Sequence, residues 1–374
     1  MRIALVSDPY SPRVGGIETQ VQNLAHALSD AGSKVTVITA TPDGDERGDS
    51  TSREGDVAIR RITTRVPFDL PVNPFAGRAL REALPAFDVV HIHTGIVSPF
   101  ARMAVNASLA TGTKAVLTWH SHLADATWWY GLTNPLRSWE RSGIKLTAVS
   151  KAAADAVARS SLGEIHVDVL PNLIFEEPWE ASRVRALKRL QNHGFEQSAG
   201  EGTFRPMRAV TATRLAPRKR VVPLANLAKK ASVEVDIFGG GPQLSQLQEM
   251  AKRGAPINLH GKVSPKELAR AYEDTDVFVS PVVKEAFGIA ALEARACGLP
   301  VIYREGAGIE EFITHGKDGL KTRSDDEMAA ALAMLANHPE RLHAMRRYAL
   351  EHPISHTWSR GLKQYLDLYE TMRN

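Results

Sequence analysis

The sequence predicts an α/β fold with two domains, each built on a parallel sheet, and three observations predict it. Short apolar runs of strand type alternate with helical patterns, as they do in parallel sheets whose crossover connections are helices. The 374 residues exceed what a single hydrophobic core usually serves. The alternation also lapses after Pro171-Asn172 and resumes at Arg208. We therefore expect domains at residues 1–175 and 176–355.

The first half of the chain carries a regular series of apolar runs separated by helical patterns. The expected strands are Ile3–Ser7, Lys34–Thr39, Val57–Ile62, Val89–His93, Ala115–Thr118, Leu146–Ser150 and Val167–Leu170. The expected helices include Thr19–Ala31, Pro99–Ala110 and Lys151–Ser160. The stretch Thr41–Ser52 is polar and predicts a loop.

The second half repeats this organisation and ends in a helical pattern. The expected strands are Arg208–Thr213, Val233–Phe238, Ile257–Leu259, Val277–Val279 and Val301–Ile302. Near the end of the chain, apolar residues recur at helical spacing and predict an amphipathic helix. They are Trp358, Leu362, Tyr365, Leu366 and Tyr369.

Charge and composition narrow the classes of function. The formal net charge is +4 and the pI is about 9.1. Lys/Arg and Asp/Glu balance at 17 each in residues 1–175, so the positive excess lies in the second half. Part of it is a cluster that comprises Arg214, Arg218, Lys219 and Arg220. A cluster of this size suits a diphosphate better than a duplex, and we expect no nucleic-acid partner.

Membrane-spanning and disulfide-linked folds are not expected. The sequence has no apolar run of about 18 residues, and Met1–Asp8 enters a strand directly instead of forming a signal peptide. The single cysteine, Cys297, has no partner for an internal disulfide and is expected in the core. We therefore expect a cytoplasmic protein without cysteine-based redox or metal chemistry.

The segment 284–302 has the pattern of a sugar-nucleotide site. An apolar strand is followed by Glu285, by Gly288 and then by an Ala-rich helix that contains Glu293. The N-terminus of that helix, near Phe287, Gly288 and Ile289, offers unpaired N–H groups to a phosphate. Helical spacing would place Glu285 and Glu293 on one face, where both carboxylates would bind hydroxyls of one elongated ligand. The alternative is a capping glutamate and a solvated one.

Two Asp-x-Asp strings raise the question of a metal. Asp43-Gly44-Asp45 lies in the polar stretch, and Asp274-Thr275-Asp276 lies between an expected helix and strand. Both patterns are typical of turn and capping residues. We therefore expect no metal ligands and no cofactor.

The ordered motifs of the chain resemble glycosyltransferase family 4, in the retaining group with two facing Rossmann-like domains (the GT-B fold). In the first half they are Ser7–Thr19 with its Gly15-Gly16, Val90–His93, Leu117–His120, Ala148–Ser150 and Leu170–Asn172. In the second half they are Arg214-Leu215 with Lys219, Phe238–Pro242, Leu259–Val263 and Glu285–Glu293. The pattern departs at Thr213, Arg220, Leu173 and Gly306–Glu310, the last in the loop that would face the donor. The resemblance covers nearly the whole chain.

The resemblance implies roles for individual residues. It identifies the donor-binding residues as Gly15, Gly16, Arg214, Lys219, Gly239, Val263, Glu285, Phe287, Gly288, Ile289 and Glu293. It identifies the catalytic residues as His120, Glu285, Arg214 and Lys219. Arg214 and Lys219 would neutralise the leaving diphosphate without a metal. Glu285 would bind the sugar hydroxyls and Glu293 the ribose. From the residues alone, Gly15-Gly16 equally suits a tight turn, Arg214 and Lys219 suit a solvated loop, and a histidine at the end of a strand is more often structural.

The resemblance also implies the activity, the partners and the place of the last helix. We expect transfer of a hexosyl unit from a nucleotide-diphosphate sugar, first GDP-mannose, to a hydroxyl of a lipid or glycan acceptor. UDP-glucose or UDP-N-acetylglucosamine is the alternative donor, and a nucleotide-sugar epimerase the alternative enzyme. Peripheral association with the inner face of the cell membrane follows from a lipid acceptor. Residues 128–132, Trp-Trp-Tyr-Gly-Leu, suit a membrane-facing aromatic lip or ordinary packing. A helix at 356–374 would return to the first domain.

Two other classes of protein fit the sequence less well. A Rossmann oxidoreductase would carry Gly-x-Gly-x-x-Gly after its first strand, and the spacing around Gly15-Gly16 differs. A nucleic-acid-binding protein would show a basic face with stacking aromatics, whereas the first half is charge-neutral.

Overall fold

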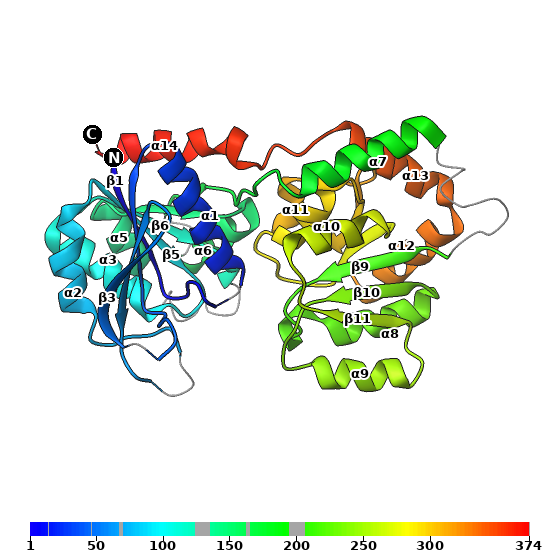
Figure 1. Cartoon of the computed structure of the whole chain (residues 1–374), viewed down its shortest axis with the longest axis horizontal. Coiled ribbons are helices and arrows are strands. Elements are labelled where there is room, and N and C mark those ends of the chain that lie inside the picture. The colour runs from blue at the N-terminus through cyan, green and yellow to red at the C-terminus, as the bar shows by residue number, and fades with distance from the viewer. Residues whose placement is uncertain are drawn as a thin grey trace. The chain divides into compact units, whose positions relative to one another are not determined.

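The computed structural model divides the chain into two compact units (Figure 1). The first unit comprises Met1–Ile174 and His356–Asn374, and the second comprises Phe175–Ser355. The structure describes residues 1–13, 15–45, 47–66, 70–123, 135–161, 165–193 and 206–373. In this part of the chain, no helix is long and apolar enough to cross a lipid bilayer.

The first unit is built on an eight-stranded sheet. The strand order is β3-β4-β2-β1-β5-β6-β7-β8, and every pairing is parallel except that between β3 and β4. The strands are β1 (Arg2–Ser7), β2 (Lys34–Thr39), β3 (Gly48–Glu54), β4 (Val57–Thr63), β5 (Val89–Thr94), β6 (Ala115–Trp119), β7 (Lys145–Ala148) and β8 (Asp168–Val169). The central strands β1 and β5 are buried almost throughout, as parallel strands covered on both faces are.

Two of the helices that cover this sheet lie side by side and share one apolar core. They are α1 (Gly16–Asp30) and the last helix α14 (Trp358–Arg373), which lies across the upper end of α1 in Figure 1. Trp358, Tyr365 and Tyr369 pack with residues of α1 and of the sheet. The apolar stripe predicted near the end of the chain therefore completes the core of the first unit. The other helices are α2 (Gly77–Ala83), α3 (Pro99–Thr111), α5 (Pro135–Arg141) and α6 (Lys151–Ser160), with a 3-10 turn at Leu84–Ala86.

The second unit is built on a six-stranded sheet whose pairings are all parallel. Its strand order is β11-β10-β9-β12-β13-β14, so the order reverses direction at β9 and β12. The strands are β9 (Arg208–Ala212), β10 (Glu234–Phe238), β11 (Ile257–Gly261), β12 (Val277–Ser280), β13 (Val301–Arg304) and β14 (Gly319–Thr322). An open parallel sheet of this kind binds its ligand beyond the carboxyl ends of the strands, where the order reverses.

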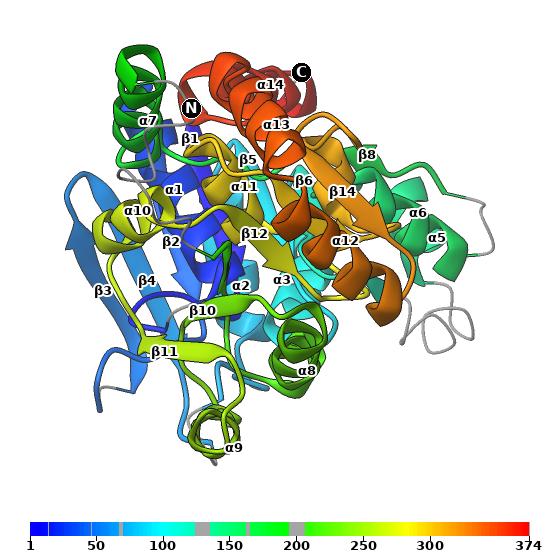
Figure 2. The same ribbon diagram turned by 90° about the vertical axis from the view of Figure 1, so that its right-hand side faces the viewer.

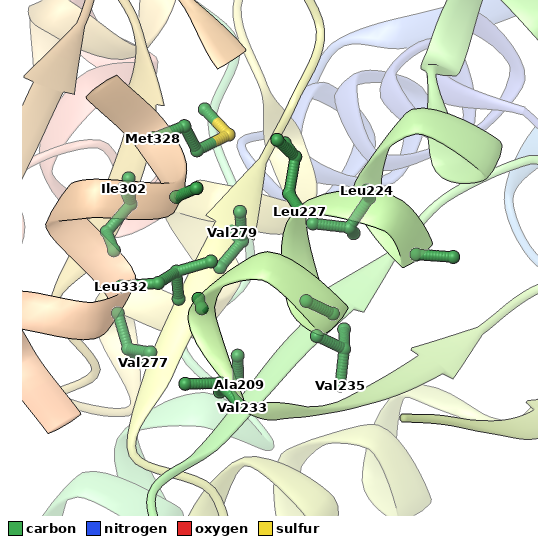
Figure 3. Packing of buried hydrophobic residues seen from close by; sticks show 14 of the residues in the cluster. Ala209, Leu224, Leu227, Val233, Val235, Val277, Val279, Ile302, Met328 and Leu332 are labelled. Carbon is green, nitrogen blue, oxygen red and sulfur yellow. The ribbon is translucent and has the colours of Figure 1, made fainter. Parts of the chain in front are cut away.

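Helices cover both faces of the second sheet. Helices α8 (Val221–Ala231) and α12 (Asp325–Asn337) contact each other (Figure 2), and Leu224, Leu227 and Leu332 extend toward the strands in the core that Figure 3 shows. A second group of contacting helices comprises α7 (Trp179–His193), α10 (Pro265–Glu273), α11 (Ile289–Ala296) and α13 (Pro339–Glu351). The remaining elements are α9 (Leu244–Lys252) and 3-10 turns at Pro217–Lys219 and Gly308–Glu311.

The prediction of two parallel-sheet α/β domains is confirmed, with one correction to the first sheet. Part of the polar stretch expected as a loop forms β3, which pairs antiparallel with β4 at the edge of the sheet. Most residues of β3 are exposed, and Gly55 at φ +59° makes the turn into β4. An edge strand with little buried surface has no apolar alternation, so the pattern did not reveal it.

Candidate active site

The donor-site residues expected in the second unit follow four neighbouring strands of one sheet. Arg214 and Lys219 follow β9, Gly239 follows β10 and Val263 follows β11. The segment that contains Glu285 to Ile289 follows β12. Since all four strands are parallel, these residues gather beyond the same carboxyl edge.

Glycine is required where α11 begins. Gly288 is the N-cap and has φ +89°, a left-handed conformation that favours glycine. A Cβ on Gly288 would lie 2.7 Å from Cγ1 of Ile309, so a side chain would also collide with the neighbouring loop. Phe287 is buried against Phe312, with ring centroids 5.4 Å apart, and Ile289 is the first residue of the helix. The start of α11 is therefore packed against Ile309 at Gly288 and against Phe312 at Phe287.

The loop Gly306–Glu310, where the chain departs from the family pattern, packs directly against Glu285. The backbone N–H of Gly308 donates to the carbonyl of Glu285 at 2.8 Å. A Cβ on Gly308 would lie 2.0 Å from the carbonyl oxygen of Ala286, so this contact also needs glycine. At the other end of the loop, the N–H of Gly306 donates to the Glu310 carboxylate at 2.8 Å. The altered loop thus still supports the backbone on which Glu285 sits.

Lys219 and Glu285 form an ion pair at this edge. Lys219 Nζ donates to Glu285 Oε2 at 2.6 Å, and the exposed fractions of the two side chains are 21% and 16%. Because both groups are largely withdrawn from water, each compensates the charge of the other.

Arg214 differs from Lys219 because it has no partner in the described part of the chain. The side chain of Arg214 is exposed. Its backbone carbonyl accepts a hydrogen bond from the N–H of Ala216. Arg218, four residues further on, is also exposed and unpaired among the described residues. A free guanidinium beside a closely packed backbone is suited to bind an anion.

The backbone beside Arg214 is packed tightly against the loop after β10. Gly239 has φ +132°, and a Cβ there would lie 1.9 Å from the carbonyl oxygen of Thr213. The N–H of Leu215 donates to the carbonyl of Gly240 at 3.0 Å. Val263 is half-buried after β11. Gly239 thus permits two loops of the edge to touch.

Glu293 is a half-buried carboxylate without a hydrogen-bond partner among the described residues. Desolvation raises its pKa to about 8, against an ordinary value of 4.5. The predicted geometry was wrong in one respect. Glu285 precedes the first residue of α11, so helical spacing does not place Glu285 and Glu293 on one face.

In the first unit, Gly15 and Gly16 lie at the N-terminus of α1, after β1. Gly15 is the N-cap and has an extended backbone, and Gly16 is the first residue of the helix. The carboxylate of Glu18 folds over Gly15, where an added Cβ would lie 2.5 Å from Oε2. The first-turn N–H groups of α1 therefore already have one negative group near them.

His120 directly follows β6 and is tied to β5. Its backbone N–H donates to the carbonyl of Thr94 at 2.9 Å, and its Nε2 lies 2.9 Å from Nδ1 of His93. Burial lowers the pKa of His120 to about 4 and keeps the ring neutral near pH 7. The His93 contact was not predicted, although its motif was noted. The alternation His91-Ile92-His93 shows that both histidines share one face of β5.

Asp8 is a further buried carboxylate that the sequence interpretation did not single out. It lies just after β1, and its two oxygens accept from the N–H groups of Phe100 and Ala101 at 3.0 and 2.8 Å. Desolvation raises its pKa to about 7, while these two hydrogen bonds act to lower it. Asp8 therefore binds the N-terminus of α3 to the end of β1.

The two Asp-x-Asp strings have structural partners. Asp276 accepts from the backbone N–H of Arg208 at 2.8 Å, and Asp274 is the C-cap of α10. Asp43 lies 3.7 Å from the guanidinium of Arg61. The described residues include no cluster of three His, Cys, Asp or Glu side chains that would hold a metal. The aromatic segment 128–132 lies outside the described residues.

Two family models match the chain, one for each half. Residues 14–176 match the model described as Glycosyltransferase Family 4, and residues 205–352 match the one described as Glycosyl transferases group 1.

Several enzymes of known activity are similar along nearly the whole chain. A GDP-mannose-dependent alpha-mannosyltransferase of Mycobacterium tuberculosis is 26% identical, covering 100% of this chain and 97% of its own. A GDP-mannose-dependent alpha-(1-6)-phosphatidylinositol monomannoside mannosyltransferase of the same species is 28% identical, covering 92% and 91%. An alpha-monoglucosyldiacylglycerol synthase of Acholeplasma laidlawii is 25% identical, covering 93% and 92%.

Solved structures share the fold. Sucrose-phosphate synthase of Thermosynechococcus elongatus superimposes with a TM-score of 0.72 at 17% identity, covering 99% of this chain and 98% of its own. HepE of Anabaena in complex with UDP-glucose gives a TM-score of 0.71 at 16% identity, covering 99% and 100%.

Proposed function

Since this chain belongs to glycosyltransferase family 4 and is a retaining glycosyltransferase that moves a hexosyl unit, we propose that its donor is GDP-mannose and its acceptor a lipid hydroxyl. Two relatives that align over more than nine-tenths of the chain are named as GDP-mannose-dependent mannosyltransferases. One of them is named for a phosphatidylinositol mannoside acceptor, and a third relative is named for a glucosyl diacylglycerol product. The name of this third relative makes a nucleotide-activated glucose the second candidate donor.

The structural observation that supports a nucleotide-diphosphate sugar as the donor is the gathering of predicted donor residues beyond one edge of the second sheet. Arg214 is a cation there without a partner among the described residues, and Lys219 is a cation held by Glu285. The diphosphate leaving group gains negative charge as the glycosidic bond breaks, and preorganised cations and backbone N–H groups stabilise that charge. We assign this task to Arg214, Lys219 and the N–H groups at Gly288 and Ile289.

The carboxylates suit the two sugars of the donor. Glu285 lies beside Lys219, and we assign it to the hydroxyls of the transferred hexose. Glu293 is half-buried and has no hydrogen-bond partner in the part of the chain that the structure describes, and we assign it to the ribose hydroxyls. A hydroxyl that donates to Glu293 would offset the cost of burying its charge.

The first unit is proposed to supply the remaining groups. His120 would hydrogen-bond the transferred sugar, and the backbone at Gly15 and Gly16 would donate to the diphosphate. Val263 would meet the base through its backbone, and Gly239 would let the loop after β10 pack against the backbone beside Arg214 at the donor site.

The proposal is tested with a panel of GDP- and UDP-sugars. Release of nucleotide is measured with and without vesicles that contain phosphatidylinositol, and the anomeric configuration of the product is determined by NMR. We expect release of GDP from GDP-mannose that depends on the lipid and gives an α-mannoside. Turnover of UDP-glucose but not GDP-mannose would replace the donor assignment by the second candidate. Equal turnover on water-soluble glycans would overturn the lipid acceptor.

A further inference from the structure

We propose that His93 is a positioning residue that sets the tautomer of His120, so that His120 offers an Nδ1–H donor to its ligand. The ligand in question is the transferred sugar, and in this respect the inference rests on the proposed function. The structural part concerns the first unit alone. It depends on which atoms carry the protons in two groups of hydrogen bonds, one at His91 and one at His93, two residues apart on β5.

The first group fixes the tautomer of His91. Tyr369 Oη lies 2.6 Å from His91 Nδ1, and Thr118 Oγ1 lies 2.6 Å from His91 Nε2. Thr118 Oγ1 also lies 2.5 Å from Thr147 Oγ1, which in turn donates to the carbonyl of Leu117 at 3.3 Å. Since a carbonyl only accepts, the protons run in one direction. Tyr369 donates to His91 Nδ1, His91 Nε2–H donates to Thr118, and Thr118 donates to Thr147.

In this arrangement both ring nitrogens of His91 have a hydrogen-bond partner, so His91 shares no proton with His93. The two rings are in contact, with centroids 4.1 Å apart, but they share no hydrogen bond. Burial holds the pKa of both rings below the usual value, and burial also keeps the Tyr369 phenol protonated as a donor. His93 is therefore a neutral ring with one proton to place.

The surroundings of His93 decide where that proton lies. His93 is 2% exposed, and its Nε2 is buried without a hydrogen-bond partner among the described residues. Its Nδ1 lies 2.9 Å from Nε2 of His120. A buried N–H group without an acceptor is rarer in proteins than a buried acceptor without a donor. The proton of His93 is thus placed on Nδ1, from where it is donated to His120.

The tautomer of His120 follows from this donation. A neutral imidazole has one N–H and one acceptor nitrogen, so a His120 that accepts at Nε2 carries its proton on Nδ1. His120 Nδ1 has no partner among the described residues, and the ring is half-buried. The Nδ1–H of His120 is then a fixed donor. A donor suits a hydroxyl or ring oxygen of the sugar that presents a lone pair.

The direct test is the protonation state of the His120 ring in the full-length protein. Two-bond ¹H–¹⁵N correlation spectra of ¹⁵N-histidine-labelled protein near pH 7 distinguish Nδ1–H from Nε2–H rings. The His120 signals are assigned by their loss in a His120→Asn variant. We expect the Nδ1–H form in the wild type. An Nε2–H form in the wild type overturns the proposal, whether or not the protein transfers mannose.

Three variants test whether His93 is the cause. His93→Asn places an amide N–H near the position of Nδ1 and should keep the His120 tautomer, whereas His93→Leu removes the donor and should release His120 to the Nε2–H form. The matched control is His91→Asn, since His91 is equally buried and lies two residues away on the same face. It should alter stability but leave the His120 signals unchanged. Loss of the Nδ1–H form in the control, or its persistence in His93→Leu, contradicts the assignment.

Kinetics supply a second readout that a purely structural role would not move. His93→Leu should lower kcat about tenfold or more, the order of effect expected when the partner that orients a functional histidine is lost, while the donor Kd stays within twofold. His93→Asn should recover most of that loss. Equal kcat values in the Leu and Asn variants would show that His93 only fills space. If His93→Leu does not fold, the wild-type and His93→Asn spectra still decide the tautomer.

Discussion

Lys219 and Glu285 lie 66 residues apart in sequence, yet Lys219 Nζ donates to Glu285 Oε2 at 2.6 Å. They meet because β9 and β12, which precede their loops, are neighbours in the second sheet. A diphosphate that binds Lys219 competes with this carboxylate, so the pair stabilises the free enzyme and must adjust when the donor binds. Arg214 needs no such exchange because it has no internal partner in the described chain.

This difference predicts distinct effects of two alanine substitutions. Arg214→Ala and Lys219→Ala should each lower turnover by roughly 10²–10³, as loss of one preorganised electrostatic donor does. Lys219→Ala should also lower the melting temperature, since it leaves Glu285 without its partner, whereas Arg214→Ala should not. The measurements are steady-state kinetics and thermal melts without ligand.

Arg218→Ala is the matched control for this comparison. Arg218 is an exposed arginine of the same loop that is unpaired within the described chain, so its loss removes the same charge. It should leave both turnover and melting temperature nearly unchanged. A loss in Arg218→Ala equal to that in Arg214→Ala would mean that only the general positive field of the loop matters.

Glu293 predicts that the stability of the protein falls as the pH rises. Its pKa is about 8 in the folded protein and about 4.5 when unfolded, so the folded state binds more protons between these values. Below about pH 4.5, Glu293 does not change the free energy of unfolding. Between about pH 4.5 and pH 8 its titration lowers that free energy progressively, and above about pH 8 the loss is complete. Because water reaches part of the side chain, we expect a total effect on the order of 1–3 kcal/mol.

Glu293→Gln removes this titration and should therefore be more stable than the wild type at pH 8.5 but not at pH 4.5. Urea denaturation at both pH values gives the two free energies of unfolding. A difference between variant and wild type that does not change with pH would show that Glu293 is already ionised in the folded protein.

The same residue predicts a selective loss of nucleotide affinity. Contacts to the ribose are made equally in the ground and transition states, so Glu293→Ala should raise the Kd of the nucleotide and the KM of the donor with little change in kcat. Isothermal titration with GDP measures the affinity without turnover. A lowered kcat with unchanged GDP affinity would place Glu293 near the reacting atoms instead of the ribose.

Periodicity and length predicted the two sheets, because buried parallel strands such as β1 and β12 are nearly continuous apolar runs. The edge strand β3 was missed because its exposed polar residues have no such signal. Within the site, the glycine at the start of α11 was predictable from its place between strand and helix. The Lys219–Glu285 and His93–His120 contacts were not, since each depends on which strands become neighbours.

Metal independence is the fourth prediction. If Arg214, Lys219 and backbone N–H groups neutralise the leaving diphosphate, extensive chelation with EDTA should leave turnover within about twofold. In Lys219→Ala, added Mg²⁺ should restore part of the lost rate, since a divalent ion supplies the missing charge. Turnover of the wild type that disappears in EDTA and returns with a divalent ion would contradict the mechanism.

The last helix, α14, predicts a large effect of a truncation that removes none of the proposed donor-binding residues. Tyr365 Oη donates to the carbonyl of Pro171 at 2.8 Å, and Gln364 Nε2 donates to that of Val169 at 3.1 Å. A Cβ on Gly361 would lie 2.6 Å from Cδ2 of Leu173, so the helix packs closely on the end of the first Rossmann-like segment. Removal of α14 exposes the core that these contacts cover.

Truncation after Pro353 deletes three aromatic side chains buried in the first unit, Trp358, Tyr365 and Tyr369. Loss of one such side chain typically costs about 3–5 kcal/mol, and three exceed the whole stability of many domains. The truncated protein should therefore aggregate or bind a hydrophobic dye. A soluble truncated protein with unchanged melting temperature would show that α14 is dispensable.

A single-atom change tests the same helix without unfolding the unit. Tyr369→Phe removes the hydroxyl that donates to His91 Nδ1 and leaves a buried acceptor unpaired, which should cost about 1–3 kcal/mol. Tyr348→Phe, on α13 of the second unit, removes a hydroxyl that has no hydrogen-bond partner within the described chain, and it serves as the control. Urea denaturation should show a lower midpoint only for Tyr369→Phe. The reason is that the Tyr369 hydroxyl is the first donor in the series of hydrogen bonds that continues through His91 and Thr118 to Thr147. Equal midpoints for the two variants would mean that this order contributes nothing to the stability of the first unit.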